Sequence, residues 1–208
     1  MSRHQLTFEE EGHVYRLGKH VLPSVTTVLK ATGAYDYPEE IPRHRLEAAG
    51  IRGDRVHAAV HHYHQTGTWS PDPEIEGYLD AYRWFESDTG FVCHASEQRL
   101  FCPKLYFAGT IDEAGSIYED DSILDLKSTV DLNIEATRIQ TAAYHWLWTV
   151  NDEDPPIDPD NRFGLHLKPN GRYRLEQFDG TYSEDLASFF NRYRTYCERE
   201  GFDWTILS

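Results

Sequence analysis

The pattern of hydrophobic and polar residues between Gly109 and Thr129 predicts an antiparallel hairpin. Strand-forming residues lie on both sides of the polar run Glu119-Asp120-Asp121-Ser122, which favours a turn. Because side chains alternate between faces along a strand, Asp125 and Lys127 share one face and the neighbouring leucines take the other. Reversal at the turn brings Asp112 beside Asp125, within a residue of register. Two carboxylates and one ammonium group are therefore expected on one patch of sheet.

Periodicity and turn residues predict the remaining elements in the same way. They are a hairpin over Leu6–Phe8 and His13–Leu17, a helix after Ser24 that ends near Gly33, a helix over Arg43–Gly67 with interruptions at Gly50 and Gly53, a helix from Ile75 that ends by Gly90, a strand over Phe91–Phe101, a helix over Asn133–Val150, a hairpin of Phe163–Leu167 and Tyr173–Phe178, and a last helix capped by Thr181 or Ser183. This order indicates an α/β fold with a mixed central β-sheet around the Gly109–Thr129 hairpin and helices on both faces.

Composition places the chain among globular proteins. With 208 residues, 39% hydrophobic and 13% aromatic, one domain with a sizeable core is expected over residues 1–208. No apolar run has the length of a transmembrane helix and the N-terminus lacks an apolar signal segment, so we expect a soluble, cytoplasmic protein without a membrane partner. Cys93, Cys102 and Cys197 are odd in number and lack C-x-x-C spacing, which favours reduced thiols over disulfides or a zinc site.

The net charge of −15 constrains any binding to nucleic acid, because phosphate contacts need Lys and Arg. Most of the surface of such a protein repels DNA. The most basic region is the first part of the Arg43–Gly67 helix, with Arg43, Arg45, Arg52 and Arg55. DNA is therefore expected to approach only at a local basic or metal-filled groove.

The carboxylate pair of the central hairpin suits a hard cation such as Mg²⁺, which takes one or two carboxylates, waters and substrate phosphate. A lysine beside such an ion orients water or offsets charge on a phosphate. The alternative is a solvated hairpin in which Asp125 and Lys127 form a surface ion pair of little energetic weight. The apolar neighbours Leu124 and Leu126 favour a central strand over an exposed one.

Two helices carry further candidate residues. His57, His61 and His64 form a stripe beside an apolar face, and histidines four residues apart can share a metal or simply form a polar face. Gln140 and Tyr144 are also four apart and share a helix face, where a core tyrosine with a polar neighbour is the alternative.

The order of these pieces resembles the RecB-like exonuclease branch of the PD-(D/E)XK nuclease superfamily. The matching motifs are Gly53-x-x-x-His57 on a helix, Gly109-x-Ile111-Asp112 on a strand, Asp125-x-Lys127 on the next strand and Gln140-x-x-x-Tyr144 on the following helix. The segment Pro23–Leu29 is similar to the one that precedes this core in phage exonucleases and in mitochondrial genome maintenance exonuclease. The resemblance implies a restriction-endonuclease-like nuclease core over residues 23–150, between an N-terminal hairpin (1–22) and a C-terminal hairpin and helix (151–208).

The resemblance also implies roles for individual residues. Asp112, Asp125 and the carbonyl of Leu126 would hold Mg²⁺ or Mn²⁺ together with His57, and Lys127 would position the hydroxide. Glu97 would be a further ligand or a residue that shapes the catalytic site. The residues expected to contact substrate or to steady Lys127 are Gln140, Tyr144, Arg52, Arg55 and Ser128.

Cofactors and partners follow from the same resemblance. Some relatives hold an iron–sulfur cluster with four cysteines, but the three here are differently spaced, so no cluster is expected. The chain has no Walker motif, so no nucleotide cofactor is expected. The expected partner is DNA, as single strands or ends, with room for an oligomer and for a recombination or replication protein.

The function expected from the sequence is that of a metal-dependent deoxyribonuclease, an exonuclease in phage-type replication, recombination or repair, acting in the host cytoplasm if phage-encoded. One alternative is a nuclease-fold protein that binds DNA or a recombination partner without cleaving it, which has no need of the set Asp112, Asp125 and Lys127. A second is a histidine-rich metal-binding protein built on the His57 stripe, which leaves the aspartates unexplained.

Overall fold

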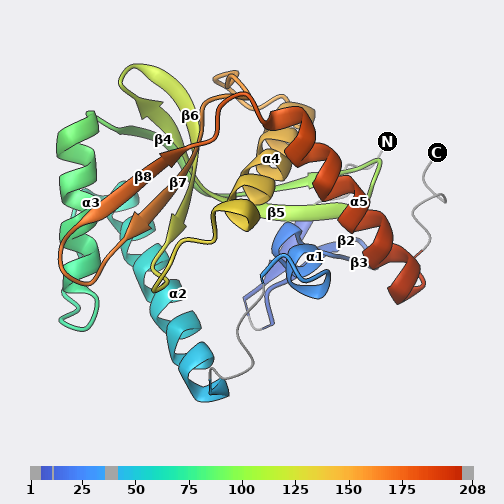
Figure 1. Cartoon of the computed structure of the whole chain (residues 1–208), viewed down its shortest axis with the longest axis horizontal. Helices are drawn as coiled ribbons and strands as arrows, with labels where there is room; N and C mark the ends of the chain where they lie inside the picture. The colour runs from blue at the N-terminus through green and yellow to red at the C-terminus, as the bar shows by residue number, and fades with distance from the viewer. Residues whose placement is uncertain (1–5, 11, 36–41, 203–208) are drawn as a thin grey trace.

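The hairpin predicted at the centre of the chain is present in the computed structural model, which describes residues 6–10, 12–35 and 42–202. Strand β5 (Phe107–Ile117) pairs antiparallel with β6 (Asp120–Lys127). Three further strands complete a sheet of order β4-β5-β6-β7-β8, namely β4 (Val92–Cys102), β7 (Arg162–Leu167) and β8 (Tyr173–Gln177). The pair β6 and β7 is parallel and the other neighbours in this sheet are antiparallel, so the sheet is mixed (Figure 1).

The register of this sheet lines up three acidic residues. Glu113 faces Leu124 on β6, so the next position along places Asp112 opposite Asp125, as the sequence predicts. By the same count on the other side, the residue of β4 that lies across from Asp112 is Glu97. One acidic residue from each of three adjacent strands therefore lies at the same level of the sheet, and we call these three residues the acidic row.

Helices cover both faces of the sheet, which confirms the predicted α/β class (Figure 1). One face carries α1 (Val25–Ala31), α4 (Ile134–Val150) and α5 (Tyr182–Glu200), and the other carries α2 (Arg43–Thr66) and α3 (Glu76–Thr89). Each face has its own apolar core, one around Trp148 and Phe189 and one around Phe85 and Leu126. Lys127 reaches α4 on the face opposite to Leu126, as strand alternation requires.

Several helices begin or end at the residues that the sequence predicts. The Ser24 hydroxyl accepts a hydrogen bond of 3.0 Å from the backbone N–H three residues later and caps α1. Asn133 caps α4 in the same way, also at 3.0 Å. Gly67 and Gly90 follow α2 and α3 with left-handed backbone angles, a conformation that glycine adopts without a steric cost.

Helix α2 differs from the prediction, since it continues through Gly50 and Gly53 without interruption. A glycine in a helix costs about 1 kcal/mol relative to alanine, which weakens a helix without breaking it. Packing of Val56 and Val60, both buried, supports the helix beyond the two glycines. Local propensity is thus overridden by tertiary contact.

The N-terminal residues form a separate three-stranded sheet of β1 (Leu6–Glu9), β2 (Val14–Leu17) and β3 (His20–Leu22). The third strand was not predicted, because three residues are too few to show a period. The hydroxyl of Tyr15 hydrogen bonds with that of Thr110 on β5, and this contact joins the small sheet to the large one.

Buried polar contacts tie the C-terminal elements to the sheet. Arg162 at the start of β7 is fully buried and its guanidinium lies 3.1 Å from a carboxylate oxygen of Asp185 on α5. The other oxygen of Asp185 is 2.7 Å from Arg138 on α4. The guanidinium of Arg162 also donates to the carbonyl of Phe178 at 3.1 Å. Because burying one member of such a set unpaired is costly, this network holds β7, α4 and α5 together.

The three cysteines are free thiols, with Cys102 and Cys197 buried and Cys93 half-buried. Within the residues that the structure describes, none of the helices has the length and apolar character needed to cross a membrane.

Candidate functional site

The imidazole of His57 on α2 meets two carboxylates of the acidic row. Its Nδ1 lies 3.5 Å from Glu97 Oε1 and 3.4 Å from Asp112 Oδ1. Its Nε2 lies 3.1 Å from the carbonyl oxygen of Leu126. One ligand atom each from His57, Glu97 and Asp112 lies within 4.8 Å of the others. We call these three residues the His57 cluster.

Backbone geometry at two positions shapes the His57 cluster. Glu97 lies within strand β4 but has a φ of 54°, in the left-handed region that residues other than glycine seldom occupy. Such a conformation costs roughly 1–3 kcal/mol and is found preferentially at functional sites. On the other side, the amide N–H of Leu126 donates to Asp112 Oδ2 at 2.7 Å, which holds that carboxylate in place.

The His57 cluster carries excess negative charge. Burial lowers the pKa of His57, but the carboxylates of Asp112 and Glu97 outweigh it and raise that pKa well above its ordinary value. Burial raises the pKa of Asp112, but His57, Lys127 and the amide of Leu126 lower it by more. The carboxylate of Asp112 is therefore ionised, and the cluster favours a bound cation.

Asp125 and Lys127 form a buried ion pair next to this cluster. Lys127 Nζ contacts Asp125 Oδ2, yet neither oxygen of Asp125 accepts a hydrogen bond of ordinary geometry from the described residues. Burial raises the pKa of Asp125 to about 7 against the opposing effect of Lys127. Burial lowers the pKa of Lys127, but the carboxylates of Asp125 and Asp112 raise it by more. Lys127 is therefore an ammonium ion, which can hold a water but cannot accept its proton.

A chain of hydrogen bonds orients Lys127. Its ammonium group donates to Gln140 Oε1 at 3.3 Å, and Gln140 Nε2 donates to the hydroxyl of Tyr144 at 2.7 Å. The hydroxyl of Tyr35 also donates to Gln140 Oε1. Tyr35 follows α1 and was not singled out from the sequence, because no local pattern links it to a residue more than a hundred positions away.

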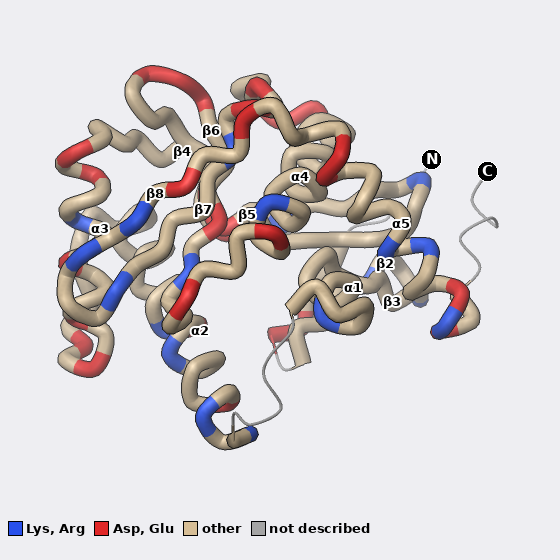
Figure 2. Tube along the Cα trace, in the orientation of Figure 1, with Lys and Arg blue, Asp and Glu red and all other residues tan. Residues whose placement is uncertain are grey.

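The basic residues of α2 divide into two kinds. The guanidinium of Arg52 donates to the carbonyl of Ser128, the residue after Lys127, at 3.4 Å. Arg55 instead forms ion pairs with Asp72 and Glu74, so most of its charge is already neutralised. A cavity of about 370 Å³ next to these residues includes both arginines in its lining. Figure 2 shows Lys and Arg spaced along α2, whereas Asp and Glu dominate the loops at the far end of the sheet.

The histidine stripe of α2 is not brought to one point. His61 Nδ1 lies 3.0 Å from the hydroxyl of Ser96, and His64 Nε2 lies 2.7 Å from Glu113 Oε1. Within the described residues, no group of metal-ligating side chains contains two of these histidines. The hypothesis of a metal shared along the stripe therefore has no support in the geometry.

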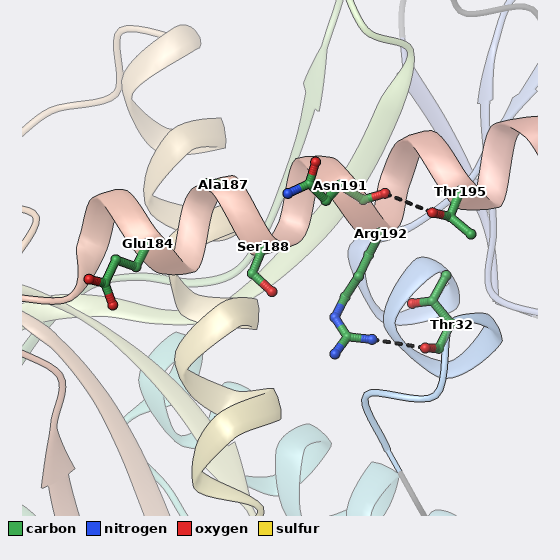
Figure 3. A pocket seen from close by; sticks show the side chains of 7 residues that line it. All are labelled: Thr32, Glu184, Ala187, Ser188, Asn191, Arg192 and Thr195. Atoms are coloured by element: carbon green, nitrogen blue, oxygen red, sulfur yellow. Dashed lines mark hydrogen bonds between the residues drawn. The ribbon is translucent and has the colours of Figure 1, made fainter.

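One surface hollow lies away from the His57 cluster. It measures about 450 Å³ and lies between α5 and the end of α1, lined mostly by small polar side chains (Figure 3). Arg192 crosses it and donates to the carbonyl of Thr32 at 2.8 Å. None of the predicted site residues lines this hollow, so we place the candidate site at the His57 cluster on chemical grounds.

No family model matches the chain, and no curated protein matches it. Among solved structures, the chain is similar to an alkaline exonuclease from Laribacter hongkongensis, at 10% identity and a TM-score of 0.32, over 89% of this chain and 94% of that one. A complex of the same exonuclease with dAMP matches at 10% identity and a TM-score of 0.33, over 90% and 95% of the two chains. Superpositions this loose carry no argument about the present chain.

Proposed function

We propose that this chain is a metal-dependent nuclease that hydrolyses DNA phosphodiester bonds. The observation that carries the proposal is the meeting of the His57 cluster with the buried pair of Asp125 and Lys127, one ion pair next to one set of metal-ligating atoms. That the enzyme acts as an exonuclease, on DNA ends or single strands, rests on the resemblance of its motif order to that of RecB-like exonucleases. A role in phage-type replication, recombination or repair is part of the same proposal.

The residues present fit a hard divalent cation such as Mg²⁺ or Mn²⁺. Such ions take mostly oxygen ligands, and the site offers the carboxylates of Glu97 and Asp112 with the carbonyl of Leu126. Both oxygens of Asp125 are buried; Oδ2 contacts Lys127, whereas Oδ1 has no hydrogen-bond partner among the described residues and is available as a ligand. With the nitrogen of His57, these atoms would hold the ion. A divalent ion bound there would polarise a phosphate oxygen and acidify a water.

The protein's own groups divide the remaining work. Lys127, held as an ammonium ion, would orient the attacking water and offset charge that develops on the phosphate. Gln140 and Tyr144 keep Lys127 in position, because the amide of Gln140 bridges the two side chains. Arg52 would contact the DNA backbone near Ser128, where its guanidinium already lies.

The experiment is incubation of the purified chain with end-labelled single-stranded and double-stranded DNA in Mg²⁺ or Mn²⁺. We expect products that shorten from an end, and no cleavage in chelator. Asp125→Ala should abolish cleavage, whereas the matched change Asp120→Ala, at an exposed position of the same strand, should leave it unchanged. Binding without cleavage by the parent chain would instead favour the non-catalytic DNA-binding alternative.

A further inference from the structure

A second group of metal-ligating side chains lies on the same three elements as the His57 cluster. His64 on α2, Cys93 on β4 and Glu113 on β5 each place one ligand atom within 4.8 Å of the other two. We call these residues the His64 cluster. Its donors are a nitrogen, a sulfur and a carboxylate oxygen, whereas the His57 cluster has one nitrogen and otherwise oxygen.

The carboxylate of Glu113 is incompletely satisfied. Its side chain is 1% exposed, and Oε1 accepts a hydrogen bond of 2.7 Å from the hydroxyl of Tyr82 and lies 2.7 Å from His64 Nε2. The other oxygen, Oε2, is buried and has no hydrogen-bond partner among the described residues. Leaving a buried carboxylate oxygen unpaired is costly, and a cation next to it would remove that cost.

The strand that carries Cys93 is irregular at this point. The pairing of β4 with β5 shifts register between Cys93 and Ala95, and such bulges redirect side chains. The thiol makes a weak hydrogen bond, donating to the carbonyl of Ala95 at 3.4 Å. Sequence spacing gives no zinc motif here, because the three donors come from positions far apart and only the fold brings them together.

The surroundings favour a site whose charges cancel. Aromatic rings of Tyr82 and Phe91 lie against the imidazole of His64, with ring centroids 5.8 Å and 6.3 Å away. In such an apolar setting a net charge is poorly tolerated. A thiolate and a carboxylate together neutralise a divalent ion, and the neutral imidazole adds no charge.

We propose that His64, Cys93 and Glu113 bind a divalent cation of the Zn²⁺ class, which ties α2 to β4 and β5. Mixed sulfur, nitrogen and oxygen ligands select such borderline ions, whereas Mg²⁺ prefers oxygen alone. Binding releases the thiol proton of Cys93 to solvent, and the three protein ligands leave one position for water. This site does not depend on the proposed nuclease function.

Cobalt(II) is the probe, because a sulfur ligand gives Co²⁺ a charge-transfer absorption in the near ultraviolet. The full chain is freed of metal with chelator and titrated with Co²⁺ in excess Mg²⁺. We expect the sulfur band to saturate at one ion per chain and to be lost in Cys93→Ser. It should remain in Cys102→Ala, the control at a buried thiol of the same strand. A band that survives Cys93→Ser, or no band in the parent chain, would overturn the proposal.

Two further measurements test the site without relying on the Cys93→Ser variant, which could fail to fold. In the unmodified chain, Zn²⁺ should protect Cys93 from alkylation by iodoacetamide, as read by mass spectrometry, and Mg²⁺ should not. Equal alkylation with and without Zn²⁺ would contradict the site. In Asp112→Ala the sulfur band should persist, which separates this site from the nuclease site. Its disappearance there would place the cobalt in the His57 cluster and overturn the proposal.

Discussion

Asp112 and Glu113 are consecutive on β5, yet their carboxylates lie in opposite electrostatic surroundings. Asp112 belongs to a partly exposed cluster, where His57 and Lys127 outweigh burial and lower its pKa. Glu113 is fully buried, and burial raises its pKa despite the neighbouring imidazole of His64. A single step along a strand thus separates a carboxylate whose pKa is lowered from one whose pKa is raised. Burial and neighbouring charge, more than residue type, decide what each can bind.

The two histidines sharpen the same contrast. His57 and His64 are separated by about two helical turns, so they share a face of α2. His57 lies with the carboxylates of Glu97 and Asp112. His64 lies with the thiol of Cys93 and the buried carboxylate of Glu113. If both proposed sites bind metal, a single helix positions one donor for a hard ion and one for a softer ion. The following predictions test that separation, from the largest expected effect to the smallest.

The largest effect is expected when the two neighbouring carboxylates are changed one at a time. Asp112→Asn should lower turnover on DNA by on the order of 10³-fold, because a charged ligand of the proposed metal is lost. Glu113→Gln should lower it by less than about tenfold, since the carboxylate of Glu113 contacts His64 and Tyr82. Turnover at saturating DNA and Mn²⁺ measures both. Similar losses in the two variants would mean that the clusters act as one site.

Lys127→Met should lower kcat by roughly 10²-fold while KM and metal affinity stay close to those of the parent chain. The reason is that an ammonium group is not a metal ligand, and that Lys127, held by Asp125 and Gln140, has the proposed task of orienting the attacking water. Single-turnover kinetics measure the rate of cleavage, and a Mn²⁺ titration measures metal affinity. The exposed Lys104→Ala is the control. A variant that binds metal poorly but turns over normally at saturation would place Lys127 in metal binding instead.

Arg52 and Arg55 of α2 should differ in DNA binding. Arg52→Ala should weaken binding and reduce the salt slope by roughly 0.9 on duplex DNA, the value for one phosphate contact. Arg55→Ala should change the slope little, because Asp72 and Glu74 already pair with its guanidinium. Fluorescence anisotropy in Ca²⁺, over a series of salt concentrations, gives both slopes. An equal reduction of the salt slope in both variants would show that Arg55 leaves its ion pairs when DNA binds.

The smallest effect concerns a third histidine, His145, which is buried and contacts a backbone carbonyl. His145 Nε2 lies 2.8 Å from the carbonyl of Ile157, and burial lowers its pKa. The unfolded chain therefore binds more protons at this position than the folded chain, so stability falls as pH drops below about 6.5. Replacing His145 by Gln should reduce that fall, measured as the midpoint of urea unfolding across pH. The exposed His62→Gln should leave the profile as it is.

Local patterns predict the parts of this fold that depend on near neighbours in sequence. The central hairpin brings Asp112 beside Asp125 because a short turn fixes its register. The caps at Ser24 and Asn133 are likewise short-range features. The mixed sheet follows from the order of strands and helices. These inferences need only periodicity and turn chemistry.

Contacts between distant segments lie beyond such patterns. The approach of Tyr35 to Gln140, the ion pairs of Arg55 and the left-handed backbone of Glu97 each depend on how whole elements pack. Sequence spacing also conceals the His64 cluster, in which Cys93 meets a histidine from another element. Motif order could point to the residues of the candidate site, but not to their protonation, which burial sets.

The parallel pairing of β6 with β7 has a consequence for the order in which the protein matures. Strand β6 forms its hairpin with β5, which is adjacent in sequence. Its other edge stays unpaired until β7 is present, and β7 is synthesised only after α4. Closing a parallel pair across a helix is slower than closing a hairpin. A nascent chain that ends before β7 leaves Asp125 and Lys127 on an unpaired edge, without the support of Gly164 and its neighbours. The proposed cleavage activity would then arise only in the finished chain, and amide protection of β6 during refolding should appear together with that of β7.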